Sequence, residues 1–250
     1  MTTLVLYVFH EYNEIVKHFI NKAIFKDDKV DFLLICNNEN KIEIDKQDYV
    51  KIIYRKNEGY DFGGWSYGLL TNNLYKNYEN FIFVNSSVIG PFLNPENNNN
   101  FKWTDIYING LIKDIKIFGS SINTCCDCSF VTDRFNPASH VQSYLFCMNI
   151  NTVDFLINKG IFSITNYIND KIHVILFKEV YMSHLILKEG WNIGCLLKCY
   201  NDYDFKDLNN KIIYGNIITN EYYNKLWNEY ETIFIKTNRD YDYKSFLNRS

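Results

Sequence analysis

The first half of the chain alternates short apolar runs of strand length with segments whose apolar residues recur at helical spacing. This alternation, with short connections, predicts an α/β fold built on a Rossmann-like, mostly parallel sheet with helices on both faces. The predicted strands are Leu4–Phe9, Val30–Cys36, Tyr49–Tyr54 and Phe81–Val84, and the predicted helices are Glu11–Phe25 and Phe62–Tyr75.

Each predicted strand ends in polar residues. Because ligands bind sheets of this kind at the carboxyl ends of the strands, these polar tips are expected to lie side by side. The tips are His10–Asn13, Asn37-Asn38, Arg55–Asp61 and Asn85–Ser87.

The second half of the chain is less regular. No linker, repeat or charge block divides the chain, so one domain over residues 1–250 is the economical interpretation. An apolar stripe near the C-terminus predicts a closing helix buried on the chain's own body, and pairing of two copies as a homodimer is the alternative. The predicted helices are Trp103–Lys113, Thr152–Lys159, Glu179–Lys188 and Asn220–Lys236, and the predicted strands are Ile115–Phe118, Val141–Cys147 and Trp191–Leu197.

Composition excludes several classes of protein. With 250 residues, 47% of them hydrophobic, and only three prolines, the chain can bury a substantial core and is not expected to be disordered. A formal net charge of -3 disfavours a dedicated nucleic-acid binder. The chain has no apolar window of about 18 residues and no signal-peptide pattern, so we expect a soluble, cytoplasmic protein without a membrane span. Seven cysteines without a secretion signal indicate reduced thiols.

The segment R-K-N-E-G-Y-D-F-G-G-W (Arg55–Trp65) lies between a predicted strand and a predicted helix, where backbone N–H groups suit a polar or anionic ligand. Arg55 can pair with a phosphate, and Asp61 can accept hydrogen bonds from a base or a ribose hydroxyl. Gly59 permits a backbone conformation that other residues rarely adopt, and Gly63-Gly64 permits close packing of the start of the helix. The structural alternative is that Asp61 only caps the helix.

The strand Phe81–Val84 ends in Asn85, Ser86 and Ser87, whose amide and hydroxyl groups could contact a sugar or a diphosphate. Divalent cations prefer carboxylate ligands, so either no metal is needed here or a nearby acid such as Asp61 supplies a ligand. The alternative is an ordinary capped turn.

Two side chains are candidates for acid–base chemistry. Glu179 is predicted to open a helix, where the helix dipole stabilises its anion and suits a general base. The pattern alone favours simple stabilisation of the helix. His140 either faces a ligand or is a hydrogen-bonded structural residue.

Three clustered cysteines form a weak metal motif. Adjacent cysteines depart from the usual spacing of zinc ligands, and a fourth ligand is unassigned. These residues are Cys125, Cys126 and Cys128.

Together these stretches resemble a family of GT-A-like glycosyltransferases found as short viral and bacterial proteins and related to the rhamnan synthesis F group. The resemblance runs from about Leu4 to Leu197 and is carried by the order of several blocks. The blocks are N-E-G-Y-D-F-G-G-W (Asn57–Trp65), F-V-N-S-S-V-I-G-P-F (Phe83–Phe92), W-T-D (Trp103–Asp105), H-V-Q-S (His140–Ser143) and E-V-Y-M-S-H-L-I-L-K-E-G-W-N-I (Glu179–Ile193).

The resemblance implies that residues 1–95 bind a nucleotide-diphosphate sugar, with a UDP-sugar as the favoured donor. Residues 96–200 then form the acceptor and catalytic half, and residues 201–250 form a helical extension. Glu179 matches the general base of inverting enzymes, and His140 is the second catalytic candidate. The residues implied to bind the donor are Phe9, Glu11, Asn37, Arg55, Asn57, Gly59, Asp61, Asn85, Ser86 and Ser87.

The resemblance leaves several functional points open. The family's metal-dependent members carry an Asp-x-Asp pair that holds Mn²⁺ or Mg²⁺, and this chain has Asn85, Ser86 and Ser87 there. The acceptor is expected to be a glycan or polysaccharide. If the protein is viral, the protein itself is expected in the host cytoplasm. The alternative is a non-catalytic module of the same fold that binds a nucleotide-sugar or a carbohydrate. A Rossmann-type oxidoreductase is disfavoured, because no GxGxxG follows the first strand.

Overall fold

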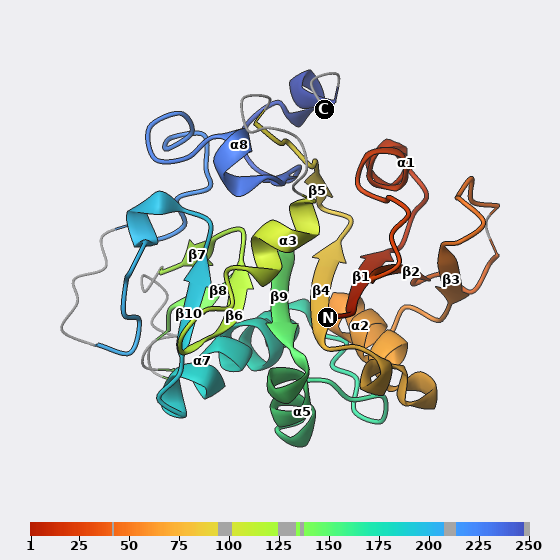
Figure 1. Ribbon diagram of the computed structural model, residues 1–250, viewed down its shortest axis with the longest axis horizontal. Coiled ribbons are helices and arrows are strands. Elements are labelled where there is room, and N and C mark those ends of the chain that lie inside the picture. The colour runs from red at the N-terminus through yellow and green to blue at the C-terminus, as the bar shows by residue number, and fades with distance from the viewer. Residues whose placement is uncertain (42, 95–101, 125–133, 136–137, 208–213, 248–250) are drawn as a thin grey trace.

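A seven-stranded sheet forms the centre of the molecule, with strand order β10-β6-β9-β4-β1-β2-β3 (Figure 1). The computed structural model describes residues 1–41, 43–94, 102–124, 134–135, 138–207 and 214–247. Strand β9 is antiparallel to both of its neighbours, β4 and β6, and every other neighbouring pair in this sheet is parallel. The predicted α/β class, with a mostly parallel sheet flanked by helices, is confirmed.

The strands of the central sheet contain residues from both predicted halves of the chain. They are β1 (Thr3–Phe9), β2 (Val30–Cys36), β3 (Lys51–Tyr54), β4 (Asn80–Asn85), β6 (Ile115–Gly119), β9 (Leu145–Asn149) and β10 (Asn192–Cys195). Two small antiparallel pairs accompany the sheet, β5 (Val88–Ile89) with β11 (Ile235–Lys236) and β7 (Ile122–Asn123) with β8 (His140–Val141).

Helices cover both faces of the sheet. In Figure 1, α1 and α3 lie above it, and α2, α5 and α7 lie below it. The α-helices are α1 (Glu14–Lys22), α2 (Tyr60–Leu70), α3 (Trp103–Ile108), α5 (Ile150–Asn158), α6 (Lys171–Val174), α7 (Tyr181–Lys188) and α8 (Glu229–Thr232). The chain also forms a π-helical turn, η2 (Ile175–Val180), and the 3-10 turns η1 (Thr71–Asn77), η3 (Lys198–Tyr200) and η4 (Tyr243–Phe246).

Two aromatic layers hold the helices to the sheet. On one face, Phe19 of α1 stacks on Tyr7 of β1 with ring centroids 3.8 Å apart. On the other face, Trp65 of α2 meets Phe83 of β4 and Phe146 of β9 edge-on at 5.7 and 5.4 Å. All five side chains are at most 1% exposed. The alternation of side chains along each strand therefore supplies both layers of the core.

The loop before α2 is built on glycine, as the sequence indicates. Gly59 is the N-cap of α2 and has a left-handed backbone, with φ at 74°. Its backbone N–H donates to Oδ1 of Asn169 at 2.8 Å. A Cβ atom on Gly63 would lie 1.9 Å from the carbonyl oxygen of Glu58. Asp61 is in the first turn of α2, so the alternative in which Asp61 is the N-cap is wrong.

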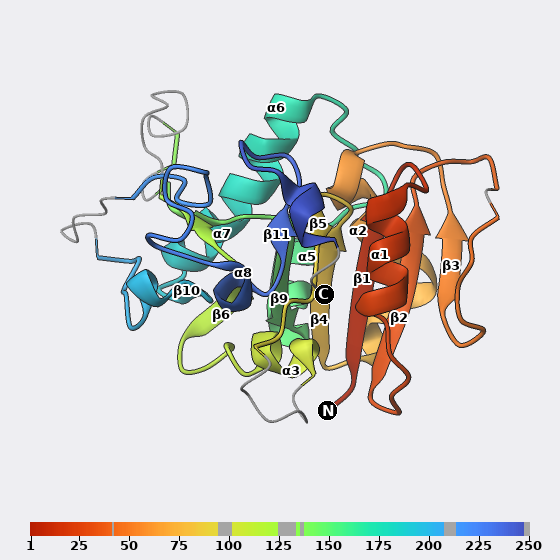
Figure 2. The ribbon, with the colours of Figure 1, turned by 90° about the horizontal axis from the view of Figure 1, so that it is seen from above.

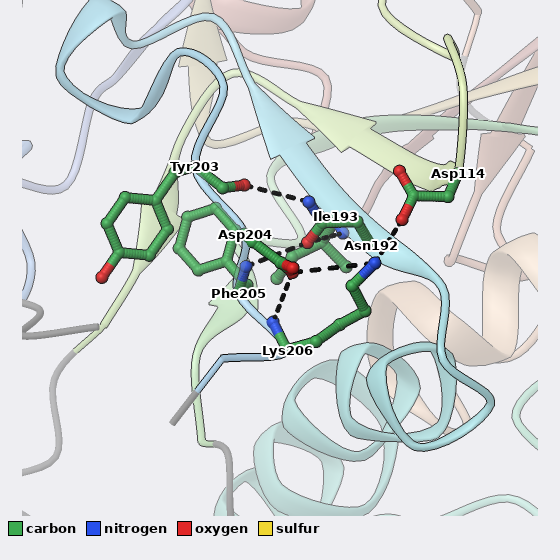
Figure 3. A network of polar contacts seen from close by, with 7 residues as sticks. All are labelled: Asp114, Asn192, Ile193, Tyr203, Asp204, Phe205 and Lys206. Atoms are coloured by element: carbon green, nitrogen blue, oxygen red, sulfur yellow. Dashed lines mark hydrogen bonds and ion pairs between the residues drawn. The ribbon is translucent and has the colours of Figure 1, made fainter. Parts of the chain in front are cut away.

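The segment after β10 is fixed against the edge of the sheet (Figure 3). The Asn192 side chain donates to the carbonyl oxygen of Tyr203 at 2.9 Å and accepts from the backbone N–H of Phe205 at 3.1 Å. Lys206 forms an ion pair with Asp114. These contacts cover an edge strand whose unpaired backbone groups would otherwise be available to other chains.

The chain from Lys171 to Lys188 forms one continuous helix, longer than the predicted helix Glu179–Lys188. In it α6 passes directly into η2 and then into α7, with helical backbone angles at both junctions. Its N-terminus is capped by Asp170, whose side chain accepts from the backbone N–H of His173 at 2.8 Å. The prediction that Glu179 opens a helix is therefore wrong.

The predicted closing helix Asn220–Lys236 is also wrong. Turns precede the short helix α8, and Ile233 ends α8 with φ at 63° before the chain pairs as β11. Part of the stripe is nevertheless buried on the chain's own body: Trp227 and Phe234 are 2% and 0% exposed, whereas Tyr230 is 45% exposed.

Other predicted elements differ at their ends. The predicted strand Val141–Cys147 is divided into β8 and β9 by a turn, and the predicted helix Trp103–Lys113 ends at Ile108. The predicted helix Phe62–Tyr75 changes at Leu70 into η1, where two asparagines have left-handed backbones.

We predict that Gly63→Ala destabilises the protein by roughly 2–3 kcal/mol, because the new Cβ atom meets a backbone atom that cannot move without shifting the loop. Gly160→Ala is the matched control. Gly160 has φ at 76° with nothing within 4 Å of the added atom, so its loss is limited to backbone strain of about 1–2 kcal/mol. Urea unfolding of the three proteins measures both losses, and equal losses would contradict the close-approach argument.

Candidate functional site

The polar tips of the first three strands contact one another, as the sequence predicts. Asn37 follows β2, and its side chain accepts from Nη1 of Arg55 at 2.7 Å and donates to the carbonyl oxygen of Tyr60 at 3.0 Å. Nδ1 of His10 lies 2.6 Å from the carbonyl oxygen of Asn37. The carboxyl edge of β1, β2 and β3 is therefore one connected surface.

Arg55 is used to hold the loop before α2. Nη2 of Arg55 donates to the carbonyl oxygen of Glu58 at 2.8 Å. The guanidinium also lies over the rings of Tyr67 and Tyr167, 5.7 and 5.0 Å from their centroids. With 7% exposure and these neutral partners, Arg55 is placed to fix the shape of the loop before α2.

The other residues predicted to bind the donor lie at the same edge of the sheet, but some are buried and others are exposed to solvent. Phe9 is 1% exposed and belongs to the core. Glu11 and Asn57 are exposed on the loops that follow β1 and β3. Glu11 and Asn57 are thus open to solvent at this edge, whereas Asp61 is half-buried.

Asp61 starts a chain of hydrogen bonds along the end of β4. Nδ2 of Asn85 donates to Oδ2 of Asp61 at 2.9 Å. Oδ1 of Asn85 accepts from the backbone N–H and the hydroxyl of Ser87, at 3.0 and 2.5 Å. Ser86 is half-buried between them in the same turn. The amide of Asn85 is therefore fixed in one orientation, with its N–H groups toward the carboxylate.

Glu179 reaches the same edge from the long helix that runs from Lys171 to Lys188. It lies in the π-helical turn η2, and its Oε1 accepts from the backbone N–H of Ser143 at 2.7 Å. Ser143 is in the turn before β9, and the next residue, Tyr144, accepts through its carbonyl oxygen from the backbone N–H of Asn85 at 3.1 Å. A backbone donor of the turn before β9, and not the N-terminus of a helix, thus holds the Glu179 carboxyl in place.

Lys236 completes the charged part of the site and was missed from the sequence. It is half-buried on β11, and its Nζ lies 5.2 Å from the centroid of the Tyr144 ring. Burial lowers the pKa of Lys236 to about 8, and the charge of Arg239 adds to the fall, while Glu179 and Asp61 oppose it. The sequence signal was a single lysine after the apolar run Ile233–Ile235.

The pKa of Asp61 is shifted in the opposite direction to that of Lys236. Burial raises the pKa of Asp61 to about 6, and the negative charge of Glu179 adds to the rise. The hydrogen bond from Asn85 and the positive charge of Lys236 oppose it. Two acids and one lysine therefore interact electrostatically at the carboxyl edge of the sheet.

His140 has a structural position. Its ring is 7% exposed, and Nδ1 lies 2.9 Å from the carbonyl oxygen of Ala138. The neighbouring Gln142 accepts from the hydroxyl of Ser121 at 2.9 Å. These contacts fix the turn that supplies Ser143.

The donor set at the end of β4 does not fit a divalent cation. The polar groups there are the amide of Asn85 and the hydroxyls of Ser86 and Ser87, and the positive charge of Lys236 acts on the carboxylates of Asp61 and Glu179. Among the described residues, no three His, Cys, Asp or Glu side chains gather in a way that could hold a metal ion. Cys125, Cys126 and Cys128 lie outside the described residues.

In the part of the chain that the structure describes, the helices lack the length and apolar composition that a membrane span requires.

We predict that Asp61→Asn stabilises the fold at neutral pH. Because the pKa of Asp61 is raised to about 6, ionising this carboxyl costs more in the folded state than in the unfolded state. The substitution removes that cost, which we put at about 1–2 kcal/mol for a half-buried group. The gain should be smallest near pH 4, grow up to about pH 6 and stay constant above it.

Thermal unfolding at several pH values measures this gain. Asp48→Asn, on an exposed residue before β3, is the control and should leave Tm unchanged. A pH-independent effect of Asp61→Asn would refute the electrostatic assignment.

Comparison with known proteins gives partial relatives. No protein-family model matches the chain. Two curated proteins from Vibrio anguillarum, each called Virulence protein VirA, are 36% identical over 128 residues, which is 49% of this chain and 34% of theirs. The match thus spans about a third of the length of these relatives. A solved structure described as apo WbbM, a bifunctional glycosyltransferase, is similar at 11% identity and a TM-score of 0.38, covering 76% of this chain and 37% of that chain.

Proposed function

We propose that this protein transfers a sugar from a nucleotide-diphosphate sugar to a hydroxyl of a glycan or polysaccharide acceptor. One observation carries the proposal: separate sequence blocks meet at one edge of the sheet. Asp61 of the first block binds Asn85 of the second, and Glu179 of the last binds Ser143 of the H-V-Q-S block. These are the blocks on which the resemblance to GT-A-like glycosyltransferases rests.

The donor side is the loop between β3 and α2 together with the turn after β4. Asn57 is exposed on this loop, and Asp61 presents a carboxylate that can accept from hydroxyl groups of a ribose or a sugar. The resemblance favours a UDP-sugar as the donor. The fixed loop geometry around Arg55 supports binding of a rigid nucleotide, since a preorganised loop loses little freedom on binding.

Glu179 is the proposed general base. Oε1 is held by the backbone N–H of Ser143, and no described residue donates a hydrogen bond to Oε2. Oε2 takes the proton of the acceptor hydroxyl, and the acceptor oxygen bonds to the anomeric carbon as its bond to the diphosphate breaks. The nucleoside diphosphate leaves with the bonding electrons, and the configuration at the anomeric carbon inverts.

The second candidate function is a non-catalytic module that binds a nucleotide-sugar or a carbohydrate. The neutral end of β4 favours it, because Asn85, Ser86 and Ser87 stand where metal-dependent enzymes of this kind carry acidic residues. The two functions differ in one measurable respect, since only the enzyme releases nucleoside diphosphate when an acceptor is present.

We predict that Glu179→Gln lowers transfer roughly 100- to 10,000-fold, which is the usual contribution of a general base. Binding of the nucleoside diphosphate should stay within about threefold of the wild type, since the amide keeps the shape of the side chain. Release of nucleoside diphosphate from a panel of nucleotide-sugars, with mixed oligosaccharide acceptors, measures the first quantity. Calorimetry with the corresponding diphosphates measures the second.

Glu189→Gln is the matched control, because Glu189 follows the same helix and pairs with Lys159 at 3.9 Å on the surface. It should transfer sugar at the wild-type rate. Wild-type transfer by Glu179→Gln would remove the base from the mechanism. Binding of diphosphates without any turnover by the wild type would favour the non-catalytic module.

A further inference from the structure

The C-terminal part of the chain returns to the end of β4. Strand β11 pairs antiparallel with β5, so that Lys236 is opposite Val88. The backbone N–H and the hydroxyl of Thr237 both donate to the carbonyl oxygen of Ser87, at 2.7 and 3.1 Å. In Figure 2, β5 and β11 lie toward the end of the sheet to which β1 and β4 point. Lys236 is thereby fixed beside the neutral Asn85–Ser87 turn.

Several cations are gathered at this point. Lys236 feels the repulsion of Arg239, on the chain just after it, and of Lys171, at the start of α6. Nε of Arg239 is buried and has no hydrogen-bond partner among the described residues. Within the same part of the structure, Lys236 has no carboxylate at ion-pair distance. Like charges held together with unused N–H donors favour an anionic ligand.

The two nearby carboxylates leave the lysine available. Asp61 is bonded to Asn85 and Glu179 is bonded to Ser143, so each already has a hydrogen-bond donor. Both still act on Lys236 as more distant negative charges. They keep the ammonium protonated near neutral pH without occupying its N–H groups.

We propose that Lys236, supported by Arg239, binds the diphosphate of the nucleotide donor and supplies the positive charge that a divalent metal gives in metal-dependent glycosyl transfer. The proposal deepens the function proposed above and rests on it for the identity of the ligand. The ammonium of Lys236 can attract the diphosphate of the bound donor. The same contact can stabilise the negative charge of the diphosphate as it departs. The C-terminal segment would then add a cation to the donor site, where the guanidinium of Arg55 is already used to hold the loop before α2.

Calorimetry tests the assignment directly, with inorganic pyrophosphate and with the uridine, guanosine, adenosine and cytidine diphosphates as probes, in buffer containing EDTA. Lys236→Met should weaken the tightest diphosphate and pyrophosphate roughly 10- to 100-fold, the usual loss for a charged hydrogen bond. The parent nucleoside, which has no phosphate, should bind both proteins equally. Lys236→Arg should restore most of the lost affinity.

Lys116→Met is the matched control. Lys116, on β6, is another half-buried lysine. Its Nζ lies over an aromatic ring, 5.8 Å from the centroid of the Trp191 ring. It should bind every probe as the wild type does. Thermal unfolding of all variants separates loss of the site from loss of the fold.

Binding measured at several pH values distinguishes the contribution of the Lys236 charge from that of the shape of its side chain. The charges that face Lys236 are Asp61 from α2, Glu179 from η2, Lys171 from α6 and Arg239 from its own segment. A nucleoside diphosphate has lost its last phosphate proton above about pH 7. Diphosphate affinity of the wild type should therefore fall roughly 10-fold between pH 7 and pH 9, while that of Lys236→Arg should change little.

Three results would overturn the assignment. The first is wild-type affinity for the diphosphates in a folded Lys236→Met protein, and the second is binding that requires Mn²⁺ or Mg²⁺. The third is failure of the wild type to bind either pyrophosphate or any diphosphate. Failure of the proposed function is distinguishable, since sugar transfer could be absent while diphosphate binding still depended on Lys236.

Discussion

The position of β4 at the centre of the sheet is the constraint on which the site depends. Its side chains are buried along its whole length, and it pairs parallel with β1 and antiparallel with β9. The antiparallel pairing brings the beginning of β9 to the end of β4, so that Val84 is opposite Leu145. The turn that carries Ser143 is therefore placed beside Asn85. A parallel strand at this position would have brought its C-terminal end there instead.

The long helix that carries Glu179 was difficult to derive from the sequence. Its first turns contain Ile172, Val174 and Ile175, β-branched residues that favour strands, and only Asp170 marks its start as an N-cap. The π-helical turn adds a local widening that no periodicity predicts. Because Glu179 lies within this helix, the helix dipole does not orient its charge, and the turn before β9 does so through one backbone N–H group.

The sequence predicts contacts that are local and misses those between distant segments. The four parallel strands were found within a few residues because apolar runs with polar ends are a local signal. The contact of Asp61 with Asn85 followed from the rule that strand ends share one edge. Lys236 was missed because β11 has two residues, and its partner β5 lies more than a hundred positions earlier in the chain. The aromatic residues near the C-terminus predict a helix. The segment forms turns instead, and its aromatic side chains pack on the core.

The electrostatics of this site oppose folding. Burial raises the pKa of Asp61 to about 6 and lowers the pKa of Lys236 to about 8, so both groups are charged together mainly between these two values. Above about pH 6 the ionised Asp61 lowers the stability of the fold, and below about pH 8 the protonated Lys236 does so as well. A structure selected only for stability would have neutral groups at both positions. A diphosphate placed against Lys236 and a sugar hydroxyl donating to Asp61 would offset these two costs, which is the behaviour expected of a site organised around its ligand.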